Sequence, residues 1–202
     1  MAAFKRPRRG CSALFLPLLI PTPAFAAVVP DDYPTIQQAL DAGSSAIQVK
    51  EGVAPERITV SRSVVIQPYV YHPYGNWTAV PRIRSMEIID PSPYESTIWV
   101  QCYGLRFLGE VRSNLCNVAS DFESCRFDSG LVSPCEWFGQ KHLIRGCLFL
   151  SSVDIAGYVQ FINNTVIGGT VAIWSDGSHD IRGNYVQGSP GAGFELSLGE
   201  SS

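Results

Sequence analysis

The feature that most constrains the fold of this sequence is a short apolar pattern that returns about every twenty residues. Each copy has an apolar residue, two polar or small residues, a Cys, Thr or Asn, any residue, and a final apolar residue. The fourth positions of the four copies are Cys125, Cys147, Thr165 and Asn184, at intervals of 22, 18 and 19 residues. One strand pattern per period of about 20 residues is the signature of a solenoid.

The repeats predict an all-β fold, a single-stranded right-handed parallel β-helix of about seven coils. Equivalent residues of adjacent parallel strands would then lie about 4.8 Å apart. Apolar residues that alternate with polar ones are expected to face the interior. The inward residues expected on this basis are Ile47, Val49, Ile58, Val60, Val64, Ile66, Phe107, Cys125, Phe127, Cys147, Phe149, Ile167, Ile181 and Val186.

One helix is expected, from Asp31 to Gly43, immediately before the first strands. Thr35 and Gln38 have the spacing of a capping box, and Gly43 is a typical C-terminal stop. An apolar stripe at helical spacing would cover one open end of the interior. The stripe consists of Ile36, Ala39 and Leu40.

The far end of the coil, after Gly191, carries only a weak strand pattern. Three explanations stay open for this end. The tail folds over it, the chain self-associates end to end, or the sequence is a truncated product.

Residues 1–26 have the pattern of a signal peptide. Four basic residues precede an apolar stretch, Ser12–Ile20. A signal-peptidase cleavage pattern, with small residues two positions apart, ends at Ala26. The apolar stretch is shorter than the roughly 20 residues that span a bilayer, which favours a cleaved signal over a membrane anchor. We therefore expect a secreted or periplasmic protein without a membrane span, whose single β-helix domain covers 28–202.

The expected mature chain is acidic. Four of the 15 Lys and Arg residues precede Ala27 and all 18 Asp and Glu residues follow it, which leaves a net charge of about −7. This negative net charge argues against a nucleic-acid partner and against purely electrostatic binding to an acidic polymer. No Cys-x-x-Cys pair is present and the chain has 3 His, so neither a metal site nor a cofactor is expected.

Cysteines align in the repeat register. Cys125 would stack on Cys147, and Cys116 on Cys135. Stacked neighbours are close enough for disulfides, but their parallel side chains suit the disulfide torsion poorly. A column of small buried thiols is the favoured interpretation, and disulfides in an oxidising compartment are the alternative.

The segment from Tyr69 to Tyr94 is rich in aromatic residues and proline and predicts a long excursion from the coil, with a strand at Arg82–Ile89. Long loops on rigid scaffolds often carry binding residues. Tyr71, Tyr74 and Trp77 are the candidates, because exposed aromatic rings can stack on sugars. The alternative is that these rings fold back onto the coil wall.

The N-terminal half resembles the opening of the pectin-lyase-like superfamily. The resemblance lies in a helix-forming run at 32–42, a strand that ends in a glycine turn at 46–52, and strands at 56–60 and 64–66. With the later repeats it covers about residues 31–190 and implies the parallel β-helix fold. It does not fix an activity, because this fold carries lyases, hydrolases, esterases and non-enzymes.

The central block is similar to that of pectinesterases, in the strand Cys125–Phe127 and in Val153-Asp154-Ile155. In that family the second strand carries a nucleophilic aspartate, which implies that role for Asp154. The family's motif for the general acid is replaced here by residues without a carboxylate, so a carboxylate such as Asp128 or Glu136 would have to occupy that position by a different route.

Other parts of the pectinesterase pattern are also missing. Gln101 is the nearest counterpart of the glutamine that stabilises the oxyanion, and it lies outside the motif. The run whose arginine holds the nucleophile is replaced by Gly183-Asn-Tyr-Val186.

Two functions follow from these observations. The first is an exported, non-catalytic module that presents the Tyr69–Trp77 loop and one coil face to a polysaccharide or a cell-envelope protein. The second is a carbohydrate-active enzyme, a pectinesterase-like esterase that uses Asp154. The esterase requires that Asp154 open onto a groove with a second carboxyl group, a glutamine and an arginine close by.

Overall fold

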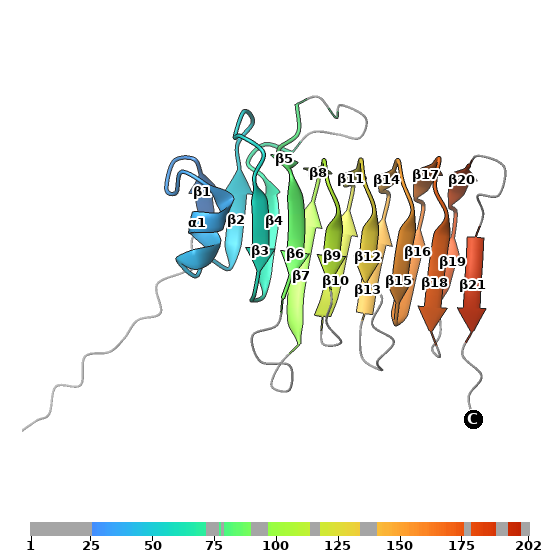
Figure 1. The fold of residues 1–202 in the computed structure, drawn as a ribbon. Helices are drawn as coiled ribbons and strands as arrows, with labels where there is room; N and C mark the ends of the chain where they lie inside the picture. Colours follow the sequence, from blue (N-terminus) through green and yellow to red (C-terminus); the bar gives the residue numbers. More distant parts are fainter. Residues whose placement is uncertain are drawn as a thin grey trace, which may run out of the picture.

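The protein is a parallel β-solenoid of about seven turns (Figure 1). The computed structural model describes residues 26–71, 77, 79–89, 97–113, 118–133, 141–175, 179–188 and 194–198 of the 202-residue chain. Every strand pair within these ranges is parallel, and each strand pairs with its equivalent one coil away. The predicted all-β parallel β-helix is therefore confirmed.

Three sheets form the walls, and their strands stack along the solenoid axis. Within the described residues, sheet A has the order β1 (Ala27–Val29), β2 (Ala46–Val49), β4 (Val64–Pro68), β7 (Ile98–Tyr103), β10 (Val118–Glu123), β13 (Lys141–Arg145), β16 (Tyr158–Ile162) and β19 (Asp180–Arg182). Sheet B consists of β3 (Arg57–Val60), β6 (Ser85–Ile88), β9 (Val111–Ser113), β12 (Leu131–Ser133), β15 (Val153–Ala156), β18 (Val171–Ser175) and β21 (Phe194–Leu198). Sheet C consists of β5 (Arg82–Ile83), β8 (Arg106–Phe107), β11 (Arg126–Phe127), β14 (Leu148–Phe149), β17 (Thr165–Ile167) and β20 (Tyr185–Gln187).

A ladder of phenylalanines fills the centre of the solenoid. Phe127 stacks on Phe107 and Phe149, with ring centroids 5.0 and 4.5 Å apart. Phe122 meets Phe127 edge-on at 5.4 Å. All four rings are fully buried. Three successive coils each contribute one ring of the stack from sheet C, and the strand spacing of about 4.8 Å matches the separation that aromatic rings prefer.

One left-handed residue turns the chain from sheet A into sheet C in each of five coils. A positive φ favours glycine, because a side chain there meets the backbone, although Asn also adopts it. The five residues, with φ between 54° and 66°, are Gly104, Ser124, Gly146, Asn163 and Gly183. This requirement explains the small residue at the third position of each repeat.

In the last four of these five coils, the residue after the left-handed one donates a side-chain hydrogen bond at the same corner. Cys125, Cys147, Asn164 and Asn184 donate to the backbone carbonyls of Cys102, Phe122, Ile144 and Phe161 on the preceding coil, at 3.3, 3.4, 2.9 and 2.6 Å. These hydrogen bonds connect each corner to a sheet A strand of the preceding coil. Cys and Asn thus serve the same purpose, which is why both residue types occur in one column.

The third repeat is in a different register from the one predicted. Phe149 pairs with Val166 rather than with Ile167, so Asn164 and not Thr165 continues the cysteine column. Val166 is fully buried, whereas Ile167 is 41% exposed, and the prediction that Ile167 points inward is wrong. Two adjacent small polar residues, Asn164 and Thr165, made both registers possible in the sequence.

Most of the other predicted inward residues are buried. Ile181 and Val186 are only partly buried against the core. Both belong to the last described coil of sheets A and C, where no further strand follows among the described residues.

The helix α1 (Ile36–Asp41) covers the other end of the interior, as predicted, although it is shorter than the expected range. The Thr35 side chain accepts a hydrogen bond from the Gln38 amide at 3.1 Å, and the Glu56 carboxylate accepts one from the Ile36 amide at 2.6 Å. Gln37 exchanges hydrogen bonds with the backbone of Thr59, on the edge strand β3. The helix therefore covers both the apolar interior and an exposed sheet edge.

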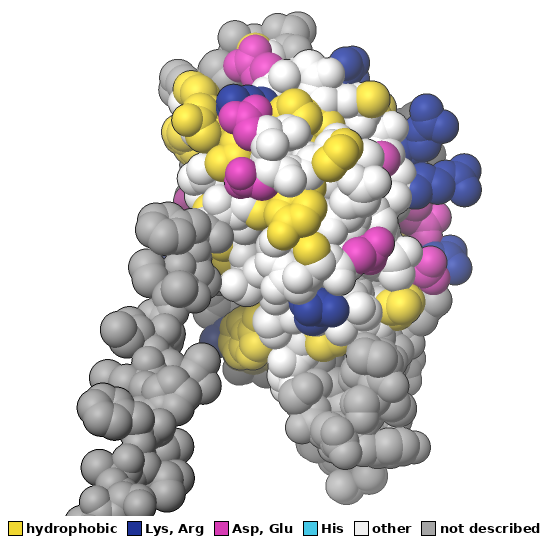
Figure 2. Space-filling model, turned by 90° about the vertical axis from the view of Figure 1, so that its left-hand side faces the viewer, with side chains coloured by type: hydrophobic (Ala, Val, Ile, Leu, Met, Phe, Trp, Pro, Cys, Tyr) yellow, Lys and Arg dark blue, Asp and Glu magenta, His cyan; other side chains and the backbone are white. Residues whose placement is uncertain are grey.

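The capped end presents a mixed surface to solvent. Viewed from the α1 end, hydrophobic side chains form small groups among acidic ones, and several Lys and Arg side chains lie along one edge (Figure 2). The described part of the chain contains no helix with the length and hydropathy of a membrane-spanning segment.

We expect the thiols of Cys102, Cys125 and Cys147 to resist alkylation in the native protein. All three are free and buried, and burial raises the thiol pKa of Cys102 and of Cys147 well above the usual value, so little reactive thiolate forms. Iodoacetamide labelling followed by peptide mass spectrometry, with and without urea, measures this. Rapid labelling without urea, or a Cys125–Cys147 disulfide in the non-reduced digest, would contradict the expectation.

Candidate functional site

Asp154 lies on β15 of sheet B and is half-buried. Its carboxylate accepts a hydrogen bond from the Trp174 indole nitrogen at 2.8 Å. Its neighbours in register on the adjacent strands are Val132 and Ala172. The hydrogen-bond partner of Asp154 in the described residues is thus an aromatic donor, and its two register neighbours are apolar.

The other residues considered for an esterase lie in different places. Asp128 follows β11 and accepts hydrogen bonds from Arg106 and Arg126, the shortest at 2.6 Å. Burial alone would raise the pKa of Asp128, but these hydrogen bonds lower it below the usual value. A general acid needs the opposite shift.

Gln101 lies on β7 of sheet A, and its register partner on β10 is Asp121. Glu136 lies outside the described residues. The structure therefore does not bring Asp154, Asp128 and Gln101 together, and a catalytic role for Asp154 stays a prediction.

A polar cluster on the outer face of sheet A was not predicted as a unit. Arg145 Nη2 lies 3.0 Å from the Glu123 carboxylate and 3.8 Å from that of Asp121. Tyr103 donates a long hydrogen bond of 3.5 Å to Asp121, which Gln101 also contacts. These five residues come from three adjacent coils, and their alignment follows only from the strand register.

Burial gives this cluster its electrostatic character. It raises the pKa of the Asp121 carboxyl above its usual value, and the nearby Arg145 opposes the shift. Burial also raises the pKa of the Tyr103 hydroxyl, and Asp121 adds to that effect. The cluster therefore carries a carboxyl group that protonates more readily than a free aspartate.

The predicted binding residues are only partly within the described chain. Tyr71 is 58% exposed, and its ring lies against the coil wall beside Gly104. Trp77 is half-buried. Tyr74 lies outside the described residues. Tyr71 thus combines both predicted arrangements, since it contacts the wall and still exposes most of its surface.

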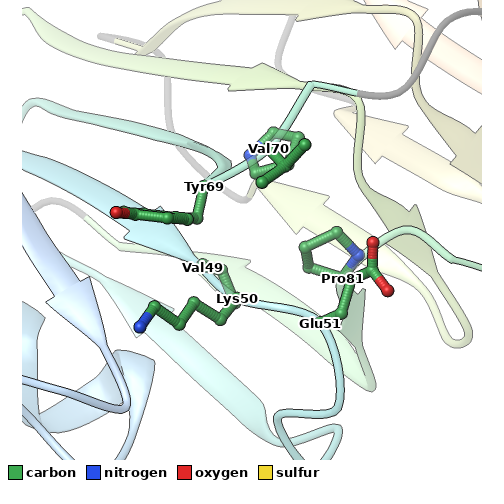
Figure 3. Close-up of a pocket in the computed structure, with 7 residues that line it drawn as sticks. Val49, Lys50, Glu51, Tyr69, Val70 and Pro81 are labelled. Atoms are coloured by element: carbon green, nitrogen blue, oxygen red, sulfur yellow. The ribbon is translucent and has the colours of Figure 1, made fainter.

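A pocket of about 270 Å³ lies at the base of this aromatic segment (Figure 3). Its lining consists of Val49, Lys50, Glu51, Pro68, Tyr69, Val70 and Pro81. The volume is just below the roughly 300–1,000 Å³ of pockets that enclose drug-sized ligands, so there is room for a small ring. Apolar side chains dominate the wall, as is usual for small-molecule sites.

Lys50 and Tyr69 form one side of the pocket. The ammonium group lies 5.0 Å from the centre of the Tyr69 ring and 2.5 Å from the Asp31 carboxylate. The hydrogen bond to Asp31 raises the pKa of Lys50. The Lys50 and Tyr69 side chains extend side by side, and the Glu51 carboxylate lies beside the Pro81 ring (Figure 3). Tyr69 keeps 50% of its surface exposed.

Sequence reasoning placed Tyr69 in the excursion but missed its partners Lys50 and Glu51. Lys50 and Glu51 lie in the turn after β2, 19 and 18 residues before Tyr69. Val49 pairs with Pro68, so the following residues Lys50 and Tyr69 are adjacent on neighbouring coils. Aligning the strands 46–49 and 65–68 would have brought them together.

Comparison of the chain with family models, curated proteins and solved structures gave no match. The parallel β-helix is compatible with the pectin-lyase-like resemblance, which rests on the sequence motifs. Among the described residues, no group of three or more His, Cys, Asp or Glu side chains is arranged to hold a metal ion.

Proposed function

We propose that this protein is an exported β-helix module of the pectin-lyase-like kind that binds carbohydrate without catalysis, through the aromatic surface of Tyr69 and Tyr71. The observation that carries the proposal is the pocket of about 270 Å³ lined by the exposed Tyr69 ring, with the exposed Tyr71 ring two residues further along the chain. Export is inferred from the signal pattern of residues 1–26.

The local chemistry suits a sugar ring. A pyranose has apolar C–H faces and a rim of hydroxyl groups, and tyrosine offers an apolar ring face with a polar tip. The pocket supplies apolar walls from Val49, Pro68 and Pro81 and polar groups from Lys50 and Glu51. A rigid coil holds these groups, so little conformational entropy is lost on binding.

We expect Tyr69→Ala and Tyr71→Ala each to weaken glycan binding by about tenfold, the effect of removing one well-placed aromatic contact. A glycan array identifies the ligand, and isothermal titration calorimetry measures the affinities. Tyr185→Ala is the matched control, because Tyr185 is also 58% exposed but lies on β20, several coils away.

Two results would overturn this proposal. The first is wild-type protein that binds no glycan, which would favour a cell-envelope protein as the partner. The second is an equal loss of affinity in Tyr185→Ala and Tyr71→Ala. The esterase that uses Asp154 and end-to-end self-association stay predictions, and neither is needed for this proposal.

A further inference from the structure

The charge around the pocket is already compensated before any ligand binds. Lys50 is the basic residue of the lining, and its ammonium is paired with Asp31 at 2.5 Å. The same ammonium lies over the Tyr69 ring, whose face is electron-rich. A carboxylate on a ligand would therefore compete with Asp31 and with the Tyr69 ring for the Lys50 ammonium group.

The second charged residue of the lining is negative. Glu51 is exposed and lies on the same turn as Lys50. Asp31 balances the charge of Lys50, and the expected mature chain is acidic. A negative ligand group would therefore meet a cation that is already paired, and it would be repelled by the wider field of the protein.

The remaining lining favours an uncharged ring. Val49, Pro68, Val70 and Pro81 supply apolar surface, and the Tyr69 ring lies beside them. The Lys50 and Glu51 groups can donate to and accept from ligand hydroxyls without meeting a like charge.

We propose that the Tyr69 pocket selects neutral, hydroxyl-bearing hexose units and discriminates against uronates and other anionic sugars. This inference rests on the proposed carbohydrate binding at the same pocket and adds the ligand class. The selectivity comes from the Asp31–Lys50 ion pair. Because the Lys50 ammonium is already bound to Asp31, it is less available to bind a carboxylate on the ligand.

The test compares matched ligands that differ only at C6. Gluco-, galacto- and manno-oligosaccharides and their C6-oxidised uronate forms are titrated into the full chain by calorimetry at low ionic strength. We expect the neutral form of the bound glycan to bind at least about fivefold more tightly than its uronate form. The difference should shrink as salt is added, because charge repulsion at the surface is screened.

Asp31→Asn should release Lys50 and reduce the preference for the neutral sugar over its uronate form by roughly threefold to fivefold, the scale of one exposed charge pair. Glu87→Gln is the control, because Glu87 is exposed on β6 of sheet B and its replacement changes the net charge equally.

The outcomes separate the two proposals. Uronates that bind as tightly as the neutral sugars would overturn the selectivity and leave carbohydrate binding intact. Equal changes of this preference in Asp31→Asn and Glu87→Gln would overturn the role of the Asp31–Lys50 pair. Failure of every sugar to bind would overturn the proposed function itself.

Discussion

Replacement of Phe127 by alanine is expected to lower the free energy of unfolding by about 3–5 kcal/mol. The Phe127 ring is fully buried and stacks between Phe107 and Phe149 with interplanar angles of 18° and 9°. Its removal leaves a cavity in the middle of the ladder and deletes the edge contact with Phe122. The neighbours cannot close this space, because the hydrogen-bonded strands hold the coils at a fixed spacing.

Urea unfolding followed by circular dichroism measures this loss. Ile167→Ala is the control, since Ile167 is 41% exposed and belongs to the same sheet C, and its replacement should cost about 1 kcal/mol or less. A small loss for Phe127→Ala together with a large loss for Ile167→Ala would contradict the observed register of the coils.

The fold could be predicted from the sequence because it depends on features that repeat. A left-handed residue recurs at one corner of five coils, a small donor follows it in four of them, and a central aromatic or aliphatic side chain accompanies both. The capping helix could also be predicted from the sequence, because Thr35, Gln38 and the apolar stripe are local signals. Each of these features is determined within a few residues of the chain.

The register error at Ile167 shows the limit of this reasoning. The sequence Asn163-Asn-Thr165 offers three polar residues in a row, and the pattern alone does not select which one fills the corner. The structure selects Asn164, because its amide both donates to the Ile144 carbonyl and accepts from the Cys147 amide. The asparagine amide meets these two partners with separate atoms, whereas a threonine would have to donate and accept through one hydroxyl oxygen on a shorter side chain.

The candidate site was less predictable, since it depends on neighbours from different coils. The exposed tyrosines could be located from composition, but the pairing of Lys50 with Tyr69 requires the register of β2 and β4. The similarity to pectinesterases at Val153-Asp154-Ile155 placed the candidate site on sheet B, whereas the polar cluster around Asp121 lies on sheet A. A motif of three residues cannot specify the side chains that adjacent coils place beside it.

The interior also contains a histidine, which is unusual for so apolar a core. His142 is 2% exposed and lies between Ser120 and Ser133, with nitrogen-to-oxygen distances of 2.7 and 3.5 Å. A further hydrogen bond joins its ring to the backbone of Ala156. The ring thus links sheet A to sheet B through neutral groups, a setting that suits an uncharged imidazole.

Acidification is therefore expected to destabilise the protein by about 3 kcal/mol between pH 6.5 and pH 4. Burial lowers the pKa of His142 from 6.5 to about 4, and the hydrogen bond to Ala156 opposes this only in part. The unfolded chain binds the proton more readily, so this contribution to stability is complete above pH 6.5 and lost as the pH falls to 4. Asp128, whose pKa is lowered, loses its contribution only below its ordinary value of 3.8. Asp121, whose pKa is raised, acts in the opposite direction.

Urea unfolding at several pH values between 7 and 4 measures the slope, and His142→Asn is the control. Asparagine keeps a neutral acceptor near Ser120 and cannot take up a proton, so the variant should lose most of the pH dependence in this range. Titration of the His142 ring by NMR in the wild-type protein gives a second readout that requires no substitution. A ring that titrates near 6.5 in the folded state, or an equal slope in His142→Asn, would show that burial of His142 does not govern the acid sensitivity.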